Sequence, residues 1–537
     1  MICFGQDVLI YRSMASTTKK KTPIVWSLLT EHAIKISLYT AFVIHAVISA
    51  HRSTTAFSYV ANALILLLAL WMVKGEVDVF IKRLRRQLPP GCLGFPIHRE
   101  IKLITDYGLI RQGLKDKRRR YGTFYTQYFF GQAIVVCDGQ DDLTWLFNND
   151  RKALTEVLWR PPMAALQGLW AVTNQTGNYH RMLRRLLEPY FAPKFVNNYL
   201  TMMDETTREE LESWSATGDY VSSNVFKMYS LRLFFKSAFG CTNEEVLARL
   251  HDDFKLWLDG VLSLTTLRIP GMRFDKAMKA RGRILAIVGQ LIDEFIVDNP
   301  EKSKRAKTTV IGRMIYGKTK DDNSMLTRDE IKDNVLILIF AGHDTTYASI
   351  STLLYHLSQN PDAMEALVEE VTMLSEPLQA DDLKNAPVLN ACINESWRMD
   401  PPVHGRFRKA VKGIEHKGYS IPAGTVFYYS IRMATTDESI YINPYTFDMR
   451  RFLPKDHHLY IASMDCGVDP FQGRANYPVF GGGTHMCLGK SFALLELRVL
   501  AVRMAKNYKV EVRNPKKTVL PITAWNIEFK MTKRKND

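Results

Sequence analysis

A glycine-rich loop near the C-terminus holds one cysteine in a setting that suits metal ligation. The loop reads FGGGTHMCLG over residues 480–489, and a helix-like run follows from Ser491 to Met504. Glycines let the backbone turn sharply and bring its N–H groups close to a ligand. The N-terminal end of the following helix adds positive potential, which favours the thiolate form of a cysteine. Cys487 is therefore a candidate metal ligand, although a lone cysteine near glycines is more often a small buried hydrophobe.

A long apolar run leads into residues that can handle protons. The run VLILIF covers residues 335–340, and AGHDTT follows it over 341–346. A helix that is apolar on all sides is buried, and glycine or threonine in its interior weakens or bends it. By itself the segment predicts a kinked core helix, with His343 as an ordinary helix residue or a pocket wall. A buried carboxylate at Asp344 beside the Thr345 hydroxyl also suits a proton relay.

An acidic and a basic residue, Glu395 and Arg398, stand three residues apart, shortly before the helix-ending sequence DPP at 400–402. At that spacing two side chains share one face of a helix and can meet. On a protein surface such a pair contributes little to stability. Taken alone, the motif therefore predicts a solvated ion pair.

The spacing of the cysteine loop resembles that of a known metal-binding loop. Its pattern, Phe-Gly-x-Gly-x-His-x-Cys-x-Gly, is similar to the heme-thiolate loop of the cytochrome P-450 family. The resemblance implies heme b (iron protoporphyrin IX) as the cofactor, with Cys487 as the proximal iron ligand. It also implies that Phe480 packs beside the sulfur and that His485 reaches a heme propionate.

The other two motifs follow in the order typical of that family. The AGHDTT segment resembles the oxygen-activation segment, which implies that Ala341 and Gly342 line the heme site. By the same resemblance, Thr345 hydrogen-bonds the bound oxygen and Asp344 helps to relay protons from solvent.

The Glu395–Arg398 pair resembles the structural Glu-x-x-Arg motif of the same family. The third member of that motif is expected from FDMRRF at 447–452. Arg451 fits best and Arg450 is the alternative. The family usually has proline where this chain has Met449, so the match is partial.

Three further residues are heme-propionate candidates by resemblance. His180 stands where most membrane-bound members have tryptophan, and either ring can donate an N–H. Arg184 follows one helical turn later and is placed for a charge-assisted bond. Arg408 is the third candidate.

The composition narrows the classes of function. The chain has 537 residues and seven cysteines, which form no Cys-x-x-Cys pair and no zinc spacing. Its net charge of +16 is compatible with nucleic acid, an acidic membrane or an acidic partner, but the sequence contains no nucleic-acid module. The resemblance implies an acidic flavoprotein, an NADPH-cytochrome reductase, as the electron donor.

An apolar stretch near the N-terminus predicts a membrane anchor. As a helix, residues 54–73 span about 30 Å, one hydrocarbon thickness, and the basic residues that follow predict a cytosolic position for that end. Residues 34–50 are a weaker candidate, either a second span or an interfacial helix. Residues 1–30 are basic and rich in serine and threonine, which leaves an organelle transit peptide open.

These segments predict two parts. Residues 1–88 form an N-terminal segment with one or two membrane-associated helices, and residues 89–537 form the catalytic domain. The resemblance implies the cytochrome P-450 fold, mainly α with a smaller β portion, in which heme lies between two core helices. The predicted location is the endoplasmic reticulum membrane with a cytosolic catalytic domain, and a plastid or mitochondrion is the alternative.

The predicted function is a heme-thiolate monooxygenase. It inserts one oxygen atom from O2 into a lipophilic substrate, such as a sterol, a terpenoid or another lipid, with electrons from NADPH. One alternative is an isomerase or dehydratase that acts on a lipid peroxide without a reductase. The other is a non-enzymatic heme- or lipid-binding protein.

Overall fold

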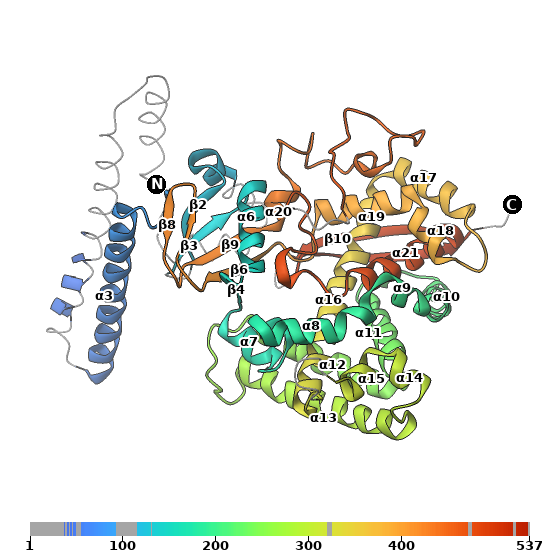
Figure 1. Ribbon diagram of the computed structural model, residues 1–537, viewed down its shortest axis with the longest axis horizontal. Helices are drawn as coiled ribbons and strands as arrows, with labels where there is room; N and C mark the ends of the chain where they lie inside the picture. The colour runs from blue at the N-terminus through green and yellow to red at the C-terminus, as the bar shows by residue number, and fades with distance from the viewer. Residues whose placement is uncertain are drawn as a thin grey trace. The chain divides into compact units, whose positions relative to one another are not determined.

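The computed structural model describes several residues between 37 and 49 and the ranges 55–92, 115–129, 132–318, 325–470, 475–518 and 522–534 (Figure 1). These residues belong to two compact units. The smaller unit combines the N-terminal region, up to Ile97, with Thr126–Ala133 and Glu415–Ile421, and the larger unit holds the rest of the chain. The predicted boundary between residues 88 and 89 stays a prediction.

The smaller unit contains one long helix and short strands. Helix α3 spans Ala56–Leu84, and the Arg83 Nη2 atom donates a 2.7 Å hydrogen bond to the Gly91 carbonyl. Strand β1, Gly91–Cys92, pairs in parallel with part of β2, Phe124–Phe129. Strands β7, Ile414–His416, and β8, Tyr419–Ile421, form a two-stranded sheet.

The predicted membrane anchor is not supported. Its best span, residues 54–73, lies largely within α3. Among the residues that the structure describes, no helix has both the length and the apolar character that crossing a membrane requires. The predicted transit peptide in residues 1–30 lies outside the described residues, as does about half of the second candidate segment, 34–50.

The larger unit is mainly helical with a smaller sheet portion, as predicted. Its principal helices are α6 (Gln140–Arg151), α7 (Pro161–Gln167), α8 (Gly177–Phe191), α10 (Leu200–Ala216), α11 (Val225–Ala238), α12 (Glu244–Val261), α13 (Arg273–Asp298), α15 (Val310–Tyr316), α16 (Arg328–Gln359), α17 (Pro361–Thr372), α19 (Pro387–Met399) and α21 (Lys490–Asn507).

Helix α16 runs through the core of this unit and contacts α11, α13, α19 and α21 (Figure 1). It begins with a capping box, in which the Thr327 side chain and Glu330 satisfy each other's backbone N–H groups. The apolar run before AGHDTT is buried, with Val335 and Leu336 fully enclosed. The predicted all-round buried helix is therefore confirmed, and it continues without a break through residues 341–346.

Two sheets complete the larger unit. In the first, β3 (Gln132–Cys137) pairs in parallel with β9 (Val426–Ser430), which pairs antiparallel with β6 (Gly405–Ala410), followed by β4 (Thr155–Leu158). In the second, β10 (Tyr508–Thr518) and β11 (Ala524–Lys533) form an antiparallel pair with β5 (Val221–Ser222) at its edge. The first sheet matters most for function because β6 carries Arg408.

Candidate active site

The cysteine loop is a tight turn that immediately precedes α21. The Cys487 backbone N–H donates to the Phe480 carbonyl at 2.8 Å, which closes the loop on itself. Gly481 and Gly483 have φ angles of 74° and 72°, a region that side chains disfavour. Residues 483–485 form one turn of 3-10 helix. The first two glycines of the motif are therefore explained by the backbone they must adopt.

Cys487 combines an exposed side chain with protein groups around its thiol. The side chain has an exposed surface, yet burial raises the pKa of its thiol above the ordinary value, against the opposing effects of Arg406 and the Gly489 N–H. Protein groups therefore lie around the thiol, while part of the side chain stays uncovered. The Phe480 ring packs in the same region, with its centroid 5.0 Å from that of Trp397.

Helix α16 is uncrowded on one side at the start of AGHDTT. Ala341 is exposed and Gly342 is half-buried, although Ile339 and His343 on either side are buried. A Cβ atom added at Gly342 would meet no described residue within 4 Å outside the helix backbone itself. The Thr345 Oγ1 atom lies 2.5 Å from the Ala341 carbonyl and donates to it. The structure therefore leaves room at these predicted cofactor-lining positions.

Asp344 is buried and held by two basic groups. The His343 Nδ1 atom lies 3.2 Å from one carboxylate oxygen, and Lys227 Nζ lies 3.4 Å from the other. Burial alone would raise the pKa of Asp344, but His343 and Lys227 outweigh it, and the pKa lies below its usual value. His343 packs against Phe254 and His251 of α12 rather than standing alone. The sequence did not indicate that His343 packs against α12, because its partners there lie about 90 residues earlier in the chain.

The structure brings Glu395, Arg398 and Arg451 together. Arg398 makes a two-pronged contact with Glu395, with N···O distances of 2.6 and 2.8 Å, and the Arg451 Nε atom lies 3.2 Å from Glu395. All three side chains are fully buried. Arg398 also donates to the carbonyls of Thr435 and Pro444. The solvated ion pair that the motif alone predicts is therefore wrong.

Arg450 takes a different role from Arg451. It pairs with Asp448 at 2.6 Å, and its side chain is 41% exposed. Of the two arginines that the sequence left open, only Arg451 contacts Glu395 within the described part of the chain.

Arg184 and His180 lie on α8 beside the cysteine loop. The Arg184 Nη1 atom donates to the Met486 carbonyl at 2.8 Å, one residue before Cys487. The His180 ring stacks on the His485 ring at 4.0 Å. Burial lowers the pKa of His180 to about 3, so its imidazole is neutral. Arg184, His180 and His485, all predicted from the sequence, therefore lie together at the cysteine loop.

Arg408 and His485 meet at a residue that the sequence did not indicate. The Arg408 Nε and His485 Nδ1 atoms each lie 3.6 Å from the Asp150 Oδ1 atom. The other His485 nitrogen lies 3.1 Å from the Gln175 carbonyl. Asp150 follows from no motif, since it is an ordinary acidic residue in the last turn of α6. Only the fold shows its position.

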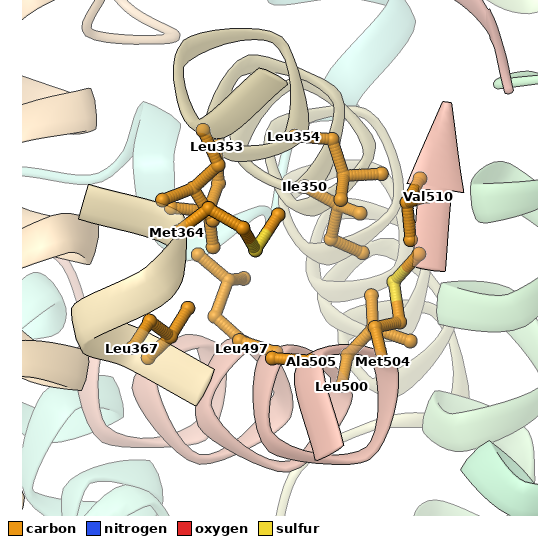
Figure 2. Close-up of a pocket in the computed structure, with 12 residues that line it drawn as sticks. Ile350, Leu353, Leu354, Met364, Leu367, Leu497, Leu500, Met504, Ala505 and Val510 are labelled. Carbon is orange, nitrogen blue, oxygen red and sulfur yellow. The ribbon is translucent and has the colours of Figure 1, made fainter. Parts of the chain in front are cut away.

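One apolar cavity in the described residues lies away from these side chains. Figure 2 shows its lining side chains, contributed mainly by α16, α17 and α21. Its volume is about 20 Å³, and Ile350, Leu354, Leu497 and Met504 are among the residues that line it. None of the predicted site residues borders it, so it has no part in the chemistry below.

The sequence model of the cytochrome P-450 family matches residues 89–536. The chain belongs to the cytochrome P-450 family. A cytochrome P-450 of Synechocystis sp. is 28% identical over 78% of this chain and 90% of its own. The β-amyrin 28-monooxygenase of Medicago truncatula is 27% identical over 83% of this chain and 92% of its own. A solved cyanobacterial P-450 with bound retinoic acid superposes with a TM-score of 0.72, at 26% identity, over 83% of this chain and 99% of that one.

Cytochromes P-450 are monooxygenases that bind heme b, and the residues of this chain fit that group. A fully buried arginine, Arg408, has no hydrogen-bond partner for its Nε and Nη2 atoms in the described residues. Such donors are costly to bury unless an anion meets them, and a propionate is such an anion. The exposure of Cys487 and the uncrowded helix surface at Ala341 and Gly342 are compatible with the same group.

Proposed function

We propose that Cys487 is the proximal ligand of heme b and that the protein is a heme-thiolate monooxygenase acting on a lipophilic substrate. The observation that carries the proposal is the open thiol of Cys487 at the turn into α21, in a chain that belongs to the P-450 family. When bound, heme b supplies the oxygen activation, and a thiolate ligand favours O–O cleavage. The protein would supply the Cys487 ligand, the residues that hold the cofactor and the groups that deliver protons.

The peptide group that joins Met486 to Cys487 would be held by hydrogen bonds to both its N–H and its carbonyl. The bond from Cys487 N to the Phe480 carbonyl closes the turn, and Arg184 secures the Met486 carbonyl from α8. Phe480, the first residue of the loop, would pack its ring beside the sulfur. A ligand held in this way needs no rearrangement to meet the iron.

Proton delivery would fall to Thr345 and Asp344. The Thr345 hydroxyl is bonded to the Ala341 carbonyl, so it can rotate from that bond toward the open side of α16 and donate there. Asp344 takes protons from the side of Lys227 and His343, which hold its two oxygens. A positioned acid of this kind contributes roughly 10²–10⁴-fold to rate.

A sterol, a terpenoid or a similar lipid is the proposed substrate class. Two similar proteins support this choice through what is known of them, one as a β-amyrin 28-monooxygenase and the other as a structure with bound retinoic acid. An NADPH-cytochrome reductase is the proposed electron donor, given the net charge of +16 and the acidic surface expected of such a flavoprotein. Location at the endoplasmic reticulum stays a prediction.

The test begins with the spectrum of the purified protein. The reduced protein with CO is expected to show the red-shifted band of thiolate-ligated heme, and Cys487→Ser is expected to lose it. Cys241→Ser serves as the matched control because Cys241 is a half-buried free cysteine outside the loop. A Cys487→Ser protein that keeps the band would overturn the assignment.

Turnover separates the monooxygenase from its alternatives. Sterol, terpenoid and fatty-acid libraries are screened for a spin-state shift, and the hits are incubated with NADPH and reductase, or with a lipid hydroperoxide alone. A monooxygenase requires the first condition. Turnover with the hydroperoxide alone indicates an isomerase or dehydratase, and binding without turnover in either condition indicates a lipid-binding protein.

A further inference from the structure

We infer that Asp150 is a positioning residue of the heme site, whose carboxylate holds the cysteine loop and Arg408 in the arrangement that receives a heme propionate. The inference rests on the proposed function. It concerns a residue of α6, Gln140–Arg151, that no sequence motif singles out.

One oxygen of Asp150 fastens the loop. The Asp150 Oδ2 atom accepts hydrogen bonds from the Thr484 backbone N–H at 2.8 Å and from its hydroxyl at 2.9 Å. Hydrogen bonds to a charged acceptor are about twice as strong as neutral ones. Because Thr484 stands three residues before Cys487, these two bonds determine where the turn of the loop lies on α6.

The glycines of the loop make this approach possible. A Cβ atom on Gly483 would collide with the Asp150 carboxylate, and one on Gly482 would collide with the Phe147 ring, also on α6. Gly483 has a φ of 72° as well. Two of the three consecutive glycines are thus required by residues of α6, one of which is Asp150. This close packing is what a positioning role needs.

The other oxygen of Asp150 faces a guanidinium and an imidazole. The Arg408 Nε atom and the His485 Nδ1 atom both lie 3.6 Å from Asp150 Oδ1. Residues from α6, β6 and the cysteine loop, three segments well separated in the sequence, thereby meet at one atom. A single carboxylate can orient both propionate candidates at once.

Arg408 is only partly satisfied by Asp150. Its Nη1 atom donates to the Phe407 carbonyl at 3.1 Å, and its guanidinium lies 5.4 Å from the centre of the Tyr429 ring. Nε and Nη2 lack a hydrogen-bond partner in the described residues, although the side chain is fully buried. A buried arginine in this state calls for a second anion. Asp150 therefore orients Arg408 without using up its donors, and these remain for a propionate.

The decisive variant is Asp150→Asn, which keeps the shape and an acceptor for Thr484 but removes the charge. The matched control is Asp142→Asn. Asp142 is a fully buried acid in the first turn of the same helix, where it accepts a hydrogen bond from the Thr123 hydroxyl. Both proteins are purified with heme, and folding is checked by circular dichroism and thermal unfolding.

Two readouts are measured that do not depend on turnover. The first is the rate at which heme passes to apomyoglobin, expected to rise about 10-fold in Asp150→Asn, as for other residues that support a ligand from behind. The second is the heme reduction potential, expected to shift upward because losing a nearby negative charge favours the form with one more electron. Asp142→Asn is expected to change neither. Equal behaviour of the two variants overturns the inference.

A double-variant comparison tests whether Asp150 acts through Arg408. If it does, Asp150→Asn shifts the potential less in an Arg408→Gln background than alone, and full additivity counts against the inference. Should Asp150→Asn fail to fold, Thr484→Val replaces it, and unchanged heme release in that protein overturns the inference. A wild-type protein that takes up no heme through Cys487 contradicts the proposed function instead.

Discussion

Two buried clusters of charge in the larger unit differ in how completely the chain satisfies them. Around Glu395, the carboxylate meets Arg398, Arg451 and the Asp448 backbone N–H. Among the polar side-chain atoms of the three charged residues, only Arg451 Nη1 lacks a hydrogen-bond partner in the described residues. The Glu395 cluster is nearly complete without any ligand.

The cluster around Asp150 is not complete. Here Arg408 keeps two donors and Asp150 keeps one oxygen without a hydrogen bond in the described part of the chain. The same principle, that buried charge must be met, explains both cases. A complete cluster stabilises the fold, whereas an incomplete one indicates where a ligand belongs. In the proposed heme site, this difference distinguishes the structural arginines from Arg408, the one that would meet the cofactor.

The largest expected effect comes from breaking the complete cluster. Glu395→Gln leaves two buried arginines without their anion, and we expect a loss of roughly 3–5 kcal/mol in the free energy of unfolding. Because the chain alone completes this cluster, the loss should be the same with and without heme. Denaturant unfolding of both forms measures it. A loss confined to the heme-bound form would show that the cluster belongs to the cofactor site.

A second complete cluster, around Asp400, should make the free energy of unfolding depend on pH. Asp400 is fully buried and accepts from Arg432 at 2.7 Å, from Trp525 at 2.8 Å and from His356, with Lys517 alongside. Burial would raise the pKa of Asp400, but Arg432, His356 and Lys517 together lower it far below its usual value.

A carboxyl group whose folded pKa is lowered contributes stability above its unfolded pKa, near 4, and loses that contribution as the pH falls further. We therefore expect the free energy of unfolding to fall below about pH 4, and Asp400→Asn to flatten that part of the profile while costing roughly 3 kcal/mol at neutral pH. Urea unfolding between neutral and acid pH measures both. An unchanged acid slope in Asp400→Asn would assign acid unfolding to other carboxylates.

The effect of breaking the incomplete cluster around Asp150 and Arg408 should instead depend on whether heme is bound. Arg408→Met is expected to cost the heme-free protein little, because the chain gives Arg408 only a long ion pair and one hydrogen bond to a backbone carbonyl. With heme it should weaken retention by about 1.5–3 kcal/mol, the value of a hydrogen bond to a charged group. Heme transfer to apomyoglobin measures the effect, and Arg398→Met is the contrasting control. Equal losses in the two forms would remove the distinction between the clusters.

The sequence motifs predict the parts of the fold and of the site that depend on residues close together in the chain. The cysteine loop with its glycines and the buried helix before AGHDTT depend on neighbours within a few residues. Asp150 could not be found in this way, because its partners Arg408 and Thr484 are distant in the chain and nothing in the spacing of α6 marks it. The same limit applies to Lys227 beside Asp344. Whether a charge is surrounded or solvated is a property of packing, and packing joins segments that the sequence keeps apart.

The adjacent arginines Arg450 and Arg451 give the smallest expected effect and the sharpest control. The sequence offers both as partners of Glu395, yet Arg450 instead pairs with Asp448 while 41% exposed. An exposed ion pair contributes at most about 1 kcal/mol, whereas removing a partner of a buried pair costs several times more. We expect Arg450→Ala to lower the free energy of unfolding by less than about 1 kcal/mol and Arg451→Ala to lower it by roughly 3 kcal/mol or more. Chemical denaturation of the two variants under the same conditions compares them directly. Similar losses would mean that completeness of the hydrogen bonds does not decide which buried arginines hold the fold together.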